Sequence, residues 1–185
     1  MLQSGWRDAR RLPVTHERVV IRDMRHDELD AIRHVTLGAY GEYAAIMPEP
    51  LWLGYRRQLL ATLETTGPVE RIVAEREASI AGSVLLFPPA TDAYGGAGGN
   101  VDYPEVRLLA VVPEARGHGI GVALMEECAR RARRAGAAAL GLHTTDMMRA
   151  AVRMYERLGY VRTPAQDFLP APGVLIKAYR LDLRG

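Results

Sequence analysis

The chain has 185 residues, of which 48% are hydrophobic, and a formal net charge of +2 at pH 7. This length and apolar content suit one folded domain with its own core, and the balanced charge argues against a nucleic-acid partner. No apolar run approaches the roughly 18 residues that a membrane helix needs, so we expect no membrane partner.

Residues 1–17 lack the apolar stretch of a secretory signal, and we expect a flexible N-terminal arm there, followed by one domain at 18–185. Apolar periodicity and turn residues predict the elements of the first half of this domain. These are a strand at 18–24, a helix from an N-cap at Asp27 to about Tyr40, a helix from Leu51 to about Thr65, and hairpin strands at 71–76 and 80–87.

The second half begins after a long glycine-rich loop at 88–104. Its predicted elements are a strand at 105–112, a helix at about 119–135, a strand at 138–143, a helix at 148–158, and strands at 160–163 and 174–183, the last two separated by a loop at 164–173. This order predicts a single α/β (α+β) domain with a mixed central sheet of about seven strands and about four flanking helices. Cys128 is the only cysteine; we expect it to pack in the core, and the lack of disulfides fits a cytoplasmic protein.

One turn in this order has the features of a phosphate site. The strand that ends at Pro113 is followed by Arg-Gly-His-Gly-Ile-Gly at 116–121 and then by an amphipathic helix. Glycines allow the backbone to approach a ligand, and the free N–H groups and dipole of the helix attract an anion. Arg116 can add a charge-assisted contact.

Two other phosphate motifs are excluded by spacing. The chain has no Gly-x-x-x-x-Gly-Lys-Ser/Thr loop, and the glycines of 116–121 do not fit Gly-x-Gly-x-x-Gly. An acidic residue about 20 positions downstream, which a dinucleotide site needs, is also missing. The turn is therefore neither a nucleoside-triphosphate loop nor a dinucleotide fingerprint.

The chain resembles the GNAT superfamily of N-acetyltransferases over residues 105–162. That family's Arg/Gln-x-x-Gly-x-Gly/Ala motif follows a strand ending in Val-x-Pro, which stands here as Val-Val-Pro at 111–113 and the turn at 116–121. Its later motif, Ala-x-x-x-Tyr-x-x-x-Gly-Tyr/Phe, stands at 151–160. Both motifs occur in the order and at the separation typical of the family.

The resemblance implies that acetyl-CoA is the cosubstrate and lies where two strands splay apart, one ending near Val112 and the other near His143. The amides of 117–122 would hold its pyrophosphate, and the backbone of 109–111 would pair with its pantetheine arm. The expected cofactor-binding residues are Leu109, Ala110, Val111, Val112, Arg116, Gly117, His118, Gly119, Ile120, Gly121 and Val122.

The resemblance also places the general acid for the leaving thiolate at Tyr155, and we expect the backbone N–H of Val111 to stabilise the oxyanion. Glu105 and His143 are each candidates to take the proton of the attacking amine, and an ordered water is a third possibility. Many relatives carry an asparagine where this chain has Met148, which removes one expected side-chain contact with the cofactor.

We thus expect an N-acetyltransferase that acts on a primary amine of a small molecule, a protein N-terminus or a lysine, without a metal. The alternatives are a non-catalytic acyl-CoA-binding module and transfer of a longer acyl group. A homodimer is left open. We expect the loop 88–104 to be mobile and to cover the acceptor. The residues that could line the acceptor site are Tyr40, Tyr43, Trp52, Tyr55, Tyr94, Asp102 and Tyr103. The first four could equally pack between helices, and Asp92 and Asp102 could attract an amine.

Overall fold

The structure is a computed structural model that describes residues 19–90, 101–171 and 173–184. The predicted N-terminal arm and the middle of the loop 88–104, including Asp92 and Tyr94, lie outside the described residues. The helices are α1 (Leu29–Tyr40), α2 (Glu49–Leu63), α3 (Ile120–Arg134) and α4 (Arg149–Arg157), with short 3-10 helices η1 (Gly41–Ala45), η2 (Pro113–Ala115) and η3 (Pro164–Gln166). The strands are β1 (Val20–Asp23), β2 (Glu70–Arg76), β3 (Ser79–Phe87), β4 (Glu105–Val111), β5 (Ala139–Thr144), β6 (Val161–Arg162), β7 (Phe168–Ala171) and β8 (Val174–Asp182).

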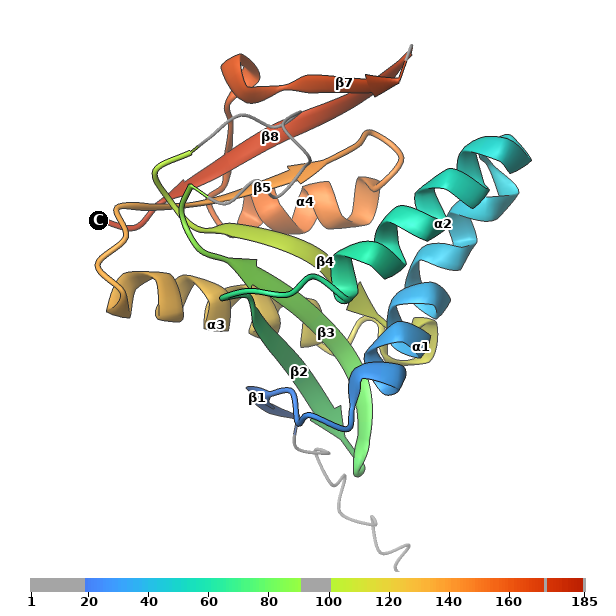
Figure 1. Cartoon of the computed structure of the whole chain (residues 1–185). Coiled ribbons are helices and arrows are strands. Elements are labelled where there is room, and N and C mark those ends of the chain that lie inside the picture. Colours follow the sequence, from blue (N-terminus) through green and yellow to red (C-terminus); the bar gives the residue numbers. More distant parts are fainter. Residues whose placement is uncertain (1–18, 91–100, 172, 185) are drawn as a thin grey trace, which may run out of the picture.

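The strands form one mixed sheet in the order β1-β2-β3-β4-β5-β8-β6, and β7 pairs with β8 (Figure 1). Neighbouring strands are antiparallel except for β4 and β5, which are parallel. The fold class predicted from the sequence is confirmed. Among the described residues, no helix is long and apolar enough to cross a membrane.

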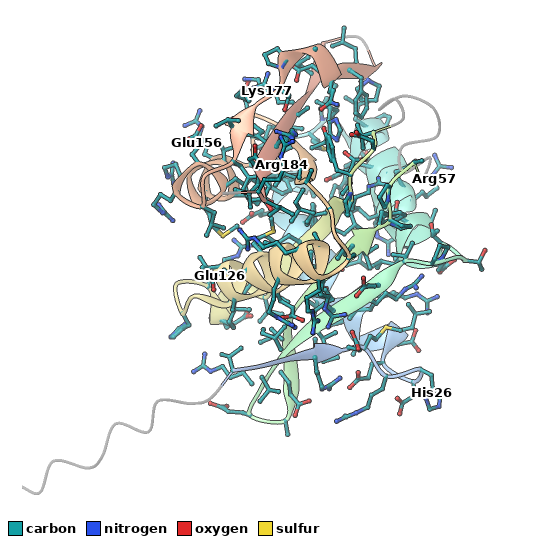
Figure 2. The ribbon with its side chains drawn as sticks, turned by 90° about the vertical axis from the view of Figure 1, so that its left-hand side faces the viewer. His26, Arg57, Glu126, Glu156, Lys177 and Arg184 are labelled. Carbon is teal, nitrogen blue, oxygen red and sulfur yellow. The ribbon has the colours of Figure 1, made fainter. Side chains whose placement is uncertain are left out.

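The helices cover the sheet on two faces. In Figure 2, Glu126 of α3 and Glu156 of α4 lie on one side of the molecule and Arg57 of α2 on the other. Successive side chains of β3 point to opposite faces of the sheet: Val84 belongs to the core under α3 and α4, and Leu85 belongs to the core under α1 and α2. Each face of the sheet therefore has its own hydrophobic layer.

Cys128 of α3 lies in the layer beneath α3 and is fully buried. Burial raises the pKa of its thiol to about 12. A thiol that stays protonated is a poor nucleophile, so the prediction that Cys128 is a core residue is confirmed.

Two local features differ from the expectation. The segment 164–173, expected as a loop, contains β7, which the sequence pattern conceals because the strand is short and includes Pro170. The expected N-cap Asp27 is replaced by Glu28, whose side chain makes no cap hydrogen bond. The Glu28 carboxylate instead forms an ion pair with Arg22 at 2.6 Å, and this lowers the pKa of Glu28 to about 2.

The first turn of α3 is held close to β3 by Gly82. A Cβ atom added at Gly82 would lie 3.0 Å from the carbonyl oxygen of Ala110, 3.0 Å from Cγ2 of Ile120 and 3.2 Å from Cδ1 of Leu124. A larger residue at this position must displace the Ile120 and Leu124 side chains, or the first turn of α3, by a few tenths of an ångström. Gly82 therefore permits the close approach of α3 to the sheet.

Substituting Gly82→Ala should lower the free energy of unfolding by about 1–2 kcal/mol, because the added methyl group overpacks this contact. Gly38→Ala is the matched control, since a Cβ at Gly38 of α1 has nothing within 4 Å. The control should gain up to about 1 kcal/mol from helix propensity. Chemical denaturation of both variants measures the two effects; equal stability of G82A and the parent would contradict the close packing.

Candidate functional site

The turn between β4 and α3 has the backbone geometry of an anion site. Gly117 and Gly119 adopt positive φ angles of +79° and +78°, which other residues adopt only with strain. Gly119 is the N-cap of α3 and no side chain caps the helix. The first N–H groups of a helix have no partner within the helix, so those of α3 are available to a ligand.

Beside this turn, β4 and β5 separate. The two strands pair only at Glu105 with Gly141 and at Val106 with Leu142, although β4 continues to Val111. The C-terminal half of β4 thus has no partner on its β5 side. The splayed strands implied by the family resemblance are present.

A β-bulge accompanies the separation. The register of β3 and β4 runs from Leu85 opposite Arg107 to Ser83 opposite Ala110, so β4 contains one extra residue. Leu108 lies in the bulge with a φ of +51°. A leucine at positive φ is strained. The residues around Leu108 do not indicate such a φ angle, so the bulge was not predicted.

The amide of Val111 points into the gap. The N–H of Val112 donates to the carbonyl oxygen of Ala81 at 2.9 Å, and successive N–H groups of a strand point in opposite directions. The N–H of Val111 is therefore directed away from β3, toward the space left by β5. This is the orientation that the expected oxyanion donor requires.

A cleft of about 450 Å³ joins the turn to the gap. Most of the expected cofactor-binding residues line it, namely Leu109, Val111, Arg116, Gly117, Gly119, Ile120, Gly121 and Val122. Ala110, Val112 and His118 are not in this lining. Ala110 is buried against α1 and α2, and the ring of His118 bonds back to the carbonyl of Arg116 at 2.9 Å.

Tyr155 of α4 lines the same cleft and is also part of the core, with 7% of the residue exposed. Its ring centroid lies 5.9 Å from that of Tyr160. Tyr155 therefore belongs both to the core and to the lining of the cleft. Met148 lines the cleft as well, at the position where many relatives have an asparagine.

The opposite wall of the cleft comes from the end of α1 and from η1. Tyr40 and Tyr43 line it, and the Tyr40 hydroxyl donates to the carbonyl oxygen of Leu109 at 3.2 Å. Burial raises the pKa of Tyr40 well above its usual range, so this hydroxyl stays protonated and remains a donor. Tyr40 also packs edge-on against Tyr43 and Tyr55, with both ring centroids at 6.1 Å. The sequence suggested these tyrosines as wall or packing residues, and it gave no sign of the link to β4.

Glu105 and His143, the two candidate proton acceptors, lie next to each other. His143 Nδ1 is 3.1 Å from Glu105 Oε1, with side chains 2% and 5% exposed. His143 Nε2 lies 3.1 Å from the carbonyl oxygen of Gln166; because a carbonyl only accepts, Nε2 carries a hydrogen. Neither side chain lines the cleft. The sequence identified both residues and did not reveal that they form a pair.

The pair is enclosed by residues of η3 and β7, the segment expected as a loop. The Tyr103 hydroxyl donates to Gln166 Oε1 at 2.5 Å, and Phe168 packs edge-on against the His143 ring at 5.3 Å. Gly141 leaves room for Tyr103, whose ring would lie 2.5 Å from a Cβ at that position. Gln166 and Phe168 are thus site neighbours that the sequence analysis missed. Asp102, a possible attractor of an amine, is exposed.

Arg116 does not extend freely into the cleft. Its guanidinium donates to Glu42 Oε2 at 2.7 Å, to the carbonyl oxygen of Ala39 at 3.0 Å and to that of Val111 at 3.4 Å. The sequence suggested a phosphate contact for this side chain, and the structure shows it engaged with the α1–η1 corner.

Known proteins share this fold. An uncharacterised N-acetyltransferase of Schizosaccharomyces pombe is 34% identical over 71 residues, which make up 38% of this chain and 44% of the yeast protein. The PaiA N-acetyltransferase of Thermoplasma acidophilum, solved in complex with coenzyme A, superposes with a TM-score of 0.65 at 15% identity, covering 89% of this chain and 99% of that one. A GNAT family acetyltransferase of Brucella melitensis, solved in complex with acetyl-CoA, gives a TM-score of 0.58 at 22% identity over 90% and 89% of the two chains.

The profile of the acetyltransferase (GNAT) family matches residues 30–160, a stretch that runs from α1 through the turn and Tyr155. This stretch includes the splayed strands, the cleft and both sequence motifs. The chain belongs to the acetyltransferase (GNAT) family.

Proposed function

We propose that the protein is an acetyl-CoA-dependent N-acetyltransferase that acts on a primary amine. The observation that carries this proposal is the single cleft that joins the free N-terminus of α3, the unpaired half of β4 and Tyr155. An elongated thioester can lie along this cleft with its phosphates at the helix and its reactive carbon at the strands. Similar folds solved with coenzyme A and with acetyl-CoA support the choice of cosubstrate.

In this proposal the backbone does most of the binding. The amides of 117–122 hold the pyrophosphate, and the open edge of β4 accepts the pantetheine arm as an added strand. Both roles place demands on glycines and strand geometry and few on side chains. This explains why Met148 can replace an asparagine without altering the fold.

Transfer then proceeds by direct attack of the amine on the thioester carbonyl. The Val111 N–H, directed into the gap, stabilises the oxyanion, and Tyr155 gives its proton to the departing sulfur. A phenol and a thiol have reference pKa values of about 10 and 8.5, so this proton transfer is uphill by roughly 2 kcal/mol. A cost of this size is compatible with general acid catalysis.

The proton of the amine goes, in this proposal, to the Glu105–His143 pair. The two side chains share one buried contact and Nε2 is already committed to Gln166, so they act as a unit at Glu105 and Nδ1. Because neither side chain lines the cleft, a water must carry the proton to them. If an ordered water alone takes the proton, as the sequence also allowed, then substituting Glu105 or His143 should leave the rate of acetyl transfer unchanged.

A non-catalytic acyl-CoA-binding module remains the second candidate, and the burial of Glu105 and His143 away from the cleft favours it. A thiol-release assay with acetyl-CoA and a panel of small amines and peptides distinguishes the two. Release that depends on an amine supports the enzyme. Coenzyme A binding without release on any amine supports the module. Cytoplasmic location and homodimer formation stay predictions.

Gly119→Asp should weaken coenzyme A binding by a factor of about 100 or more, because a carboxylate beside the α3 amides repels the phosphates. Gly136→Asp is the matched control: Gly136 follows the other end of α3 with a φ of +79° and nothing within 4 Å of a Cβ. Both variants carry similar backbone strain, and only the first faces the cleft. Calorimetric titration with coenzyme A measures the affinity; equal affinities would place the pyrophosphate elsewhere.

Tyr155→Phe should lower kcat by about 10- to 100-fold and leave the acetyl-CoA KM within about twofold, because it removes the general acid and keeps the ring. Tyr160→Phe deletes a neighbouring hydroxyl that is buried and has no hydrogen-bond partner among the described residues. Its kcat should match the parent. Steady-state kinetics of the two variants tests the assignment, which full activity of Y155F would rule out.

Glu105→Gln and His143→Asn should each lower kcat/KM for the amine at pH 7. The deficit should shrink as the pH approaches about 10, where an amine of ordinary pKa is already neutral without a base. The pH profile of kcat/KM is the measurement. A profile parallel to that of the parent would mean that the pair takes no proton from the amine.

A further inference from the structure

The side chain of Arg116 connects the turn to the helix on the opposite wall of the cleft. Its three contacts belong to three elements: Glu42 in η1, the carbonyl of Ala39 in α1, and the carbonyl of Val111 in β4. Glu42 lies 74 residues earlier in the chain. One guanidinium therefore holds together segments that are distant in sequence.

The end of α1 has a specific need for such a cation. Its last turn contains no basic residue of its own, and the carbonyl groups there carry the negative end of the helix dipole. Arg116 places a positive charge at this position and bonds one of the carbonyls directly. The planar guanidinium, with its five N–H donors in a rigid fork, can do this and pair with Glu42 at the same time.

A second contact joins the same two parts of the site. The Tyr40 hydroxyl, at the end of α1, donates to the carbonyl of Leu109 in β4 at 3.2 Å. Tyr40 and Tyr43 directly follow the two Arg116 contacts, Ala39 and Glu42, in sequence, and both tyrosines line the cleft. We call Tyr40 and Tyr43 the tyrosine wall. Its position relative to β4 is thus set by the hydrogen bond from Tyr40 to Leu109 and by the contacts of the charged Arg116 side chain.

We propose that Arg116 is a positioning residue: its side chain braces the α1–η1 corner against the cofactor turn and so sets the tyrosine wall that faces the acceptor. This inference rests on the proposed function. It replaces the phosphate contact suggested by the sequence for the side chain, and it leaves phosphate binding to the backbone amides. Arg116 then affects the amine more than the cofactor.

The test compares Arg116→Met, Glu42→Gln and the double variant, with Glu114→Gln as the control. Glu114, in η2 beside the turn, is exposed and has no ion pair among the described residues, so it removes the same charge without breaking the brace. Hydrogen exchange of the amides at 39–47 reports the corner, and calorimetric titration reports coenzyme A affinity.

A brace predicts that Arg116→Met and Glu42→Gln both speed exchange at 39–47 by about tenfold or more, that the double variant is no faster than the worse single variant, and that Glu114→Gln exchanges like the parent. With the amine that gives the fastest thiol release, both single variants should raise the amine KM about fivefold or more, with the acetyl-CoA KM within about twofold.

A phosphate ligand predicts opposite signs. Glu42→Gln would then free the guanidinium and bind coenzyme A about tenfold tighter than Glu114→Gln, while Arg116→Met would bind it about tenfold more weakly. That result, or unchanged exchange at 39–47, would overturn the brace. Failure of the parent protein to bind coenzyme A would refute the proposed function alone, because the exchange measurement needs no ligand.

Discussion

The site depends on one feature of the sheet: β4 and β5 stop pairing after Val106 and Leu142. The rest of β4 then has no strand on its β5 side, and the carbonyl groups of Leu109 and Val111 accept hydrogen bonds from the side chains of Tyr40 and Arg116 instead. The bulge at Leu108 lets β4 keep its pairing with β3 while its other side opens. The turn at the end of β4, the N-terminus of α3, the Tyr155 side chain and the Tyr40 hydroxyl all converge on this opening.

Local chemistry predicted the turn from the sequence, and the family resemblance singled out Tyr155, which lines the cleft. Glycines at alternating positions before an amphipathic helix identify an anion site, and the two motifs with their spacing identify the family. The helices and most strands follow from apolar periodicity in the same way. Gly117 and Gly119 are needed because the local turn before α3 requires positive φ angles at both positions.

Features that depend on distant contacts could not be predicted. The residues around Leu108 do not indicate a positive φ angle. Strand β7 is short and contains Pro170, so its sequence pattern is typical of a loop. The contact between Glu105 and His143 requires the β4–β5 pairing, which brings Gly141 opposite Glu105. Arg116 shows the same limit, because the sequence indicates an anion site in the turn that contains it and does not indicate that the Glu42 carboxylate of η1 pairs with its side chain.

The central claim is that the opening between β4 and β5 is the cofactor site, and mapping amide chemical shifts by NMR during a titration with coenzyme A tests it most directly. We expect the largest changes at Val111 and at the amides of 117–122. Strands β1 and β2, at the edge of the sheet away from β5, should show no more than small changes. Shifts concentrated away from the turn and β4, or none at saturating coenzyme A, would contradict the account.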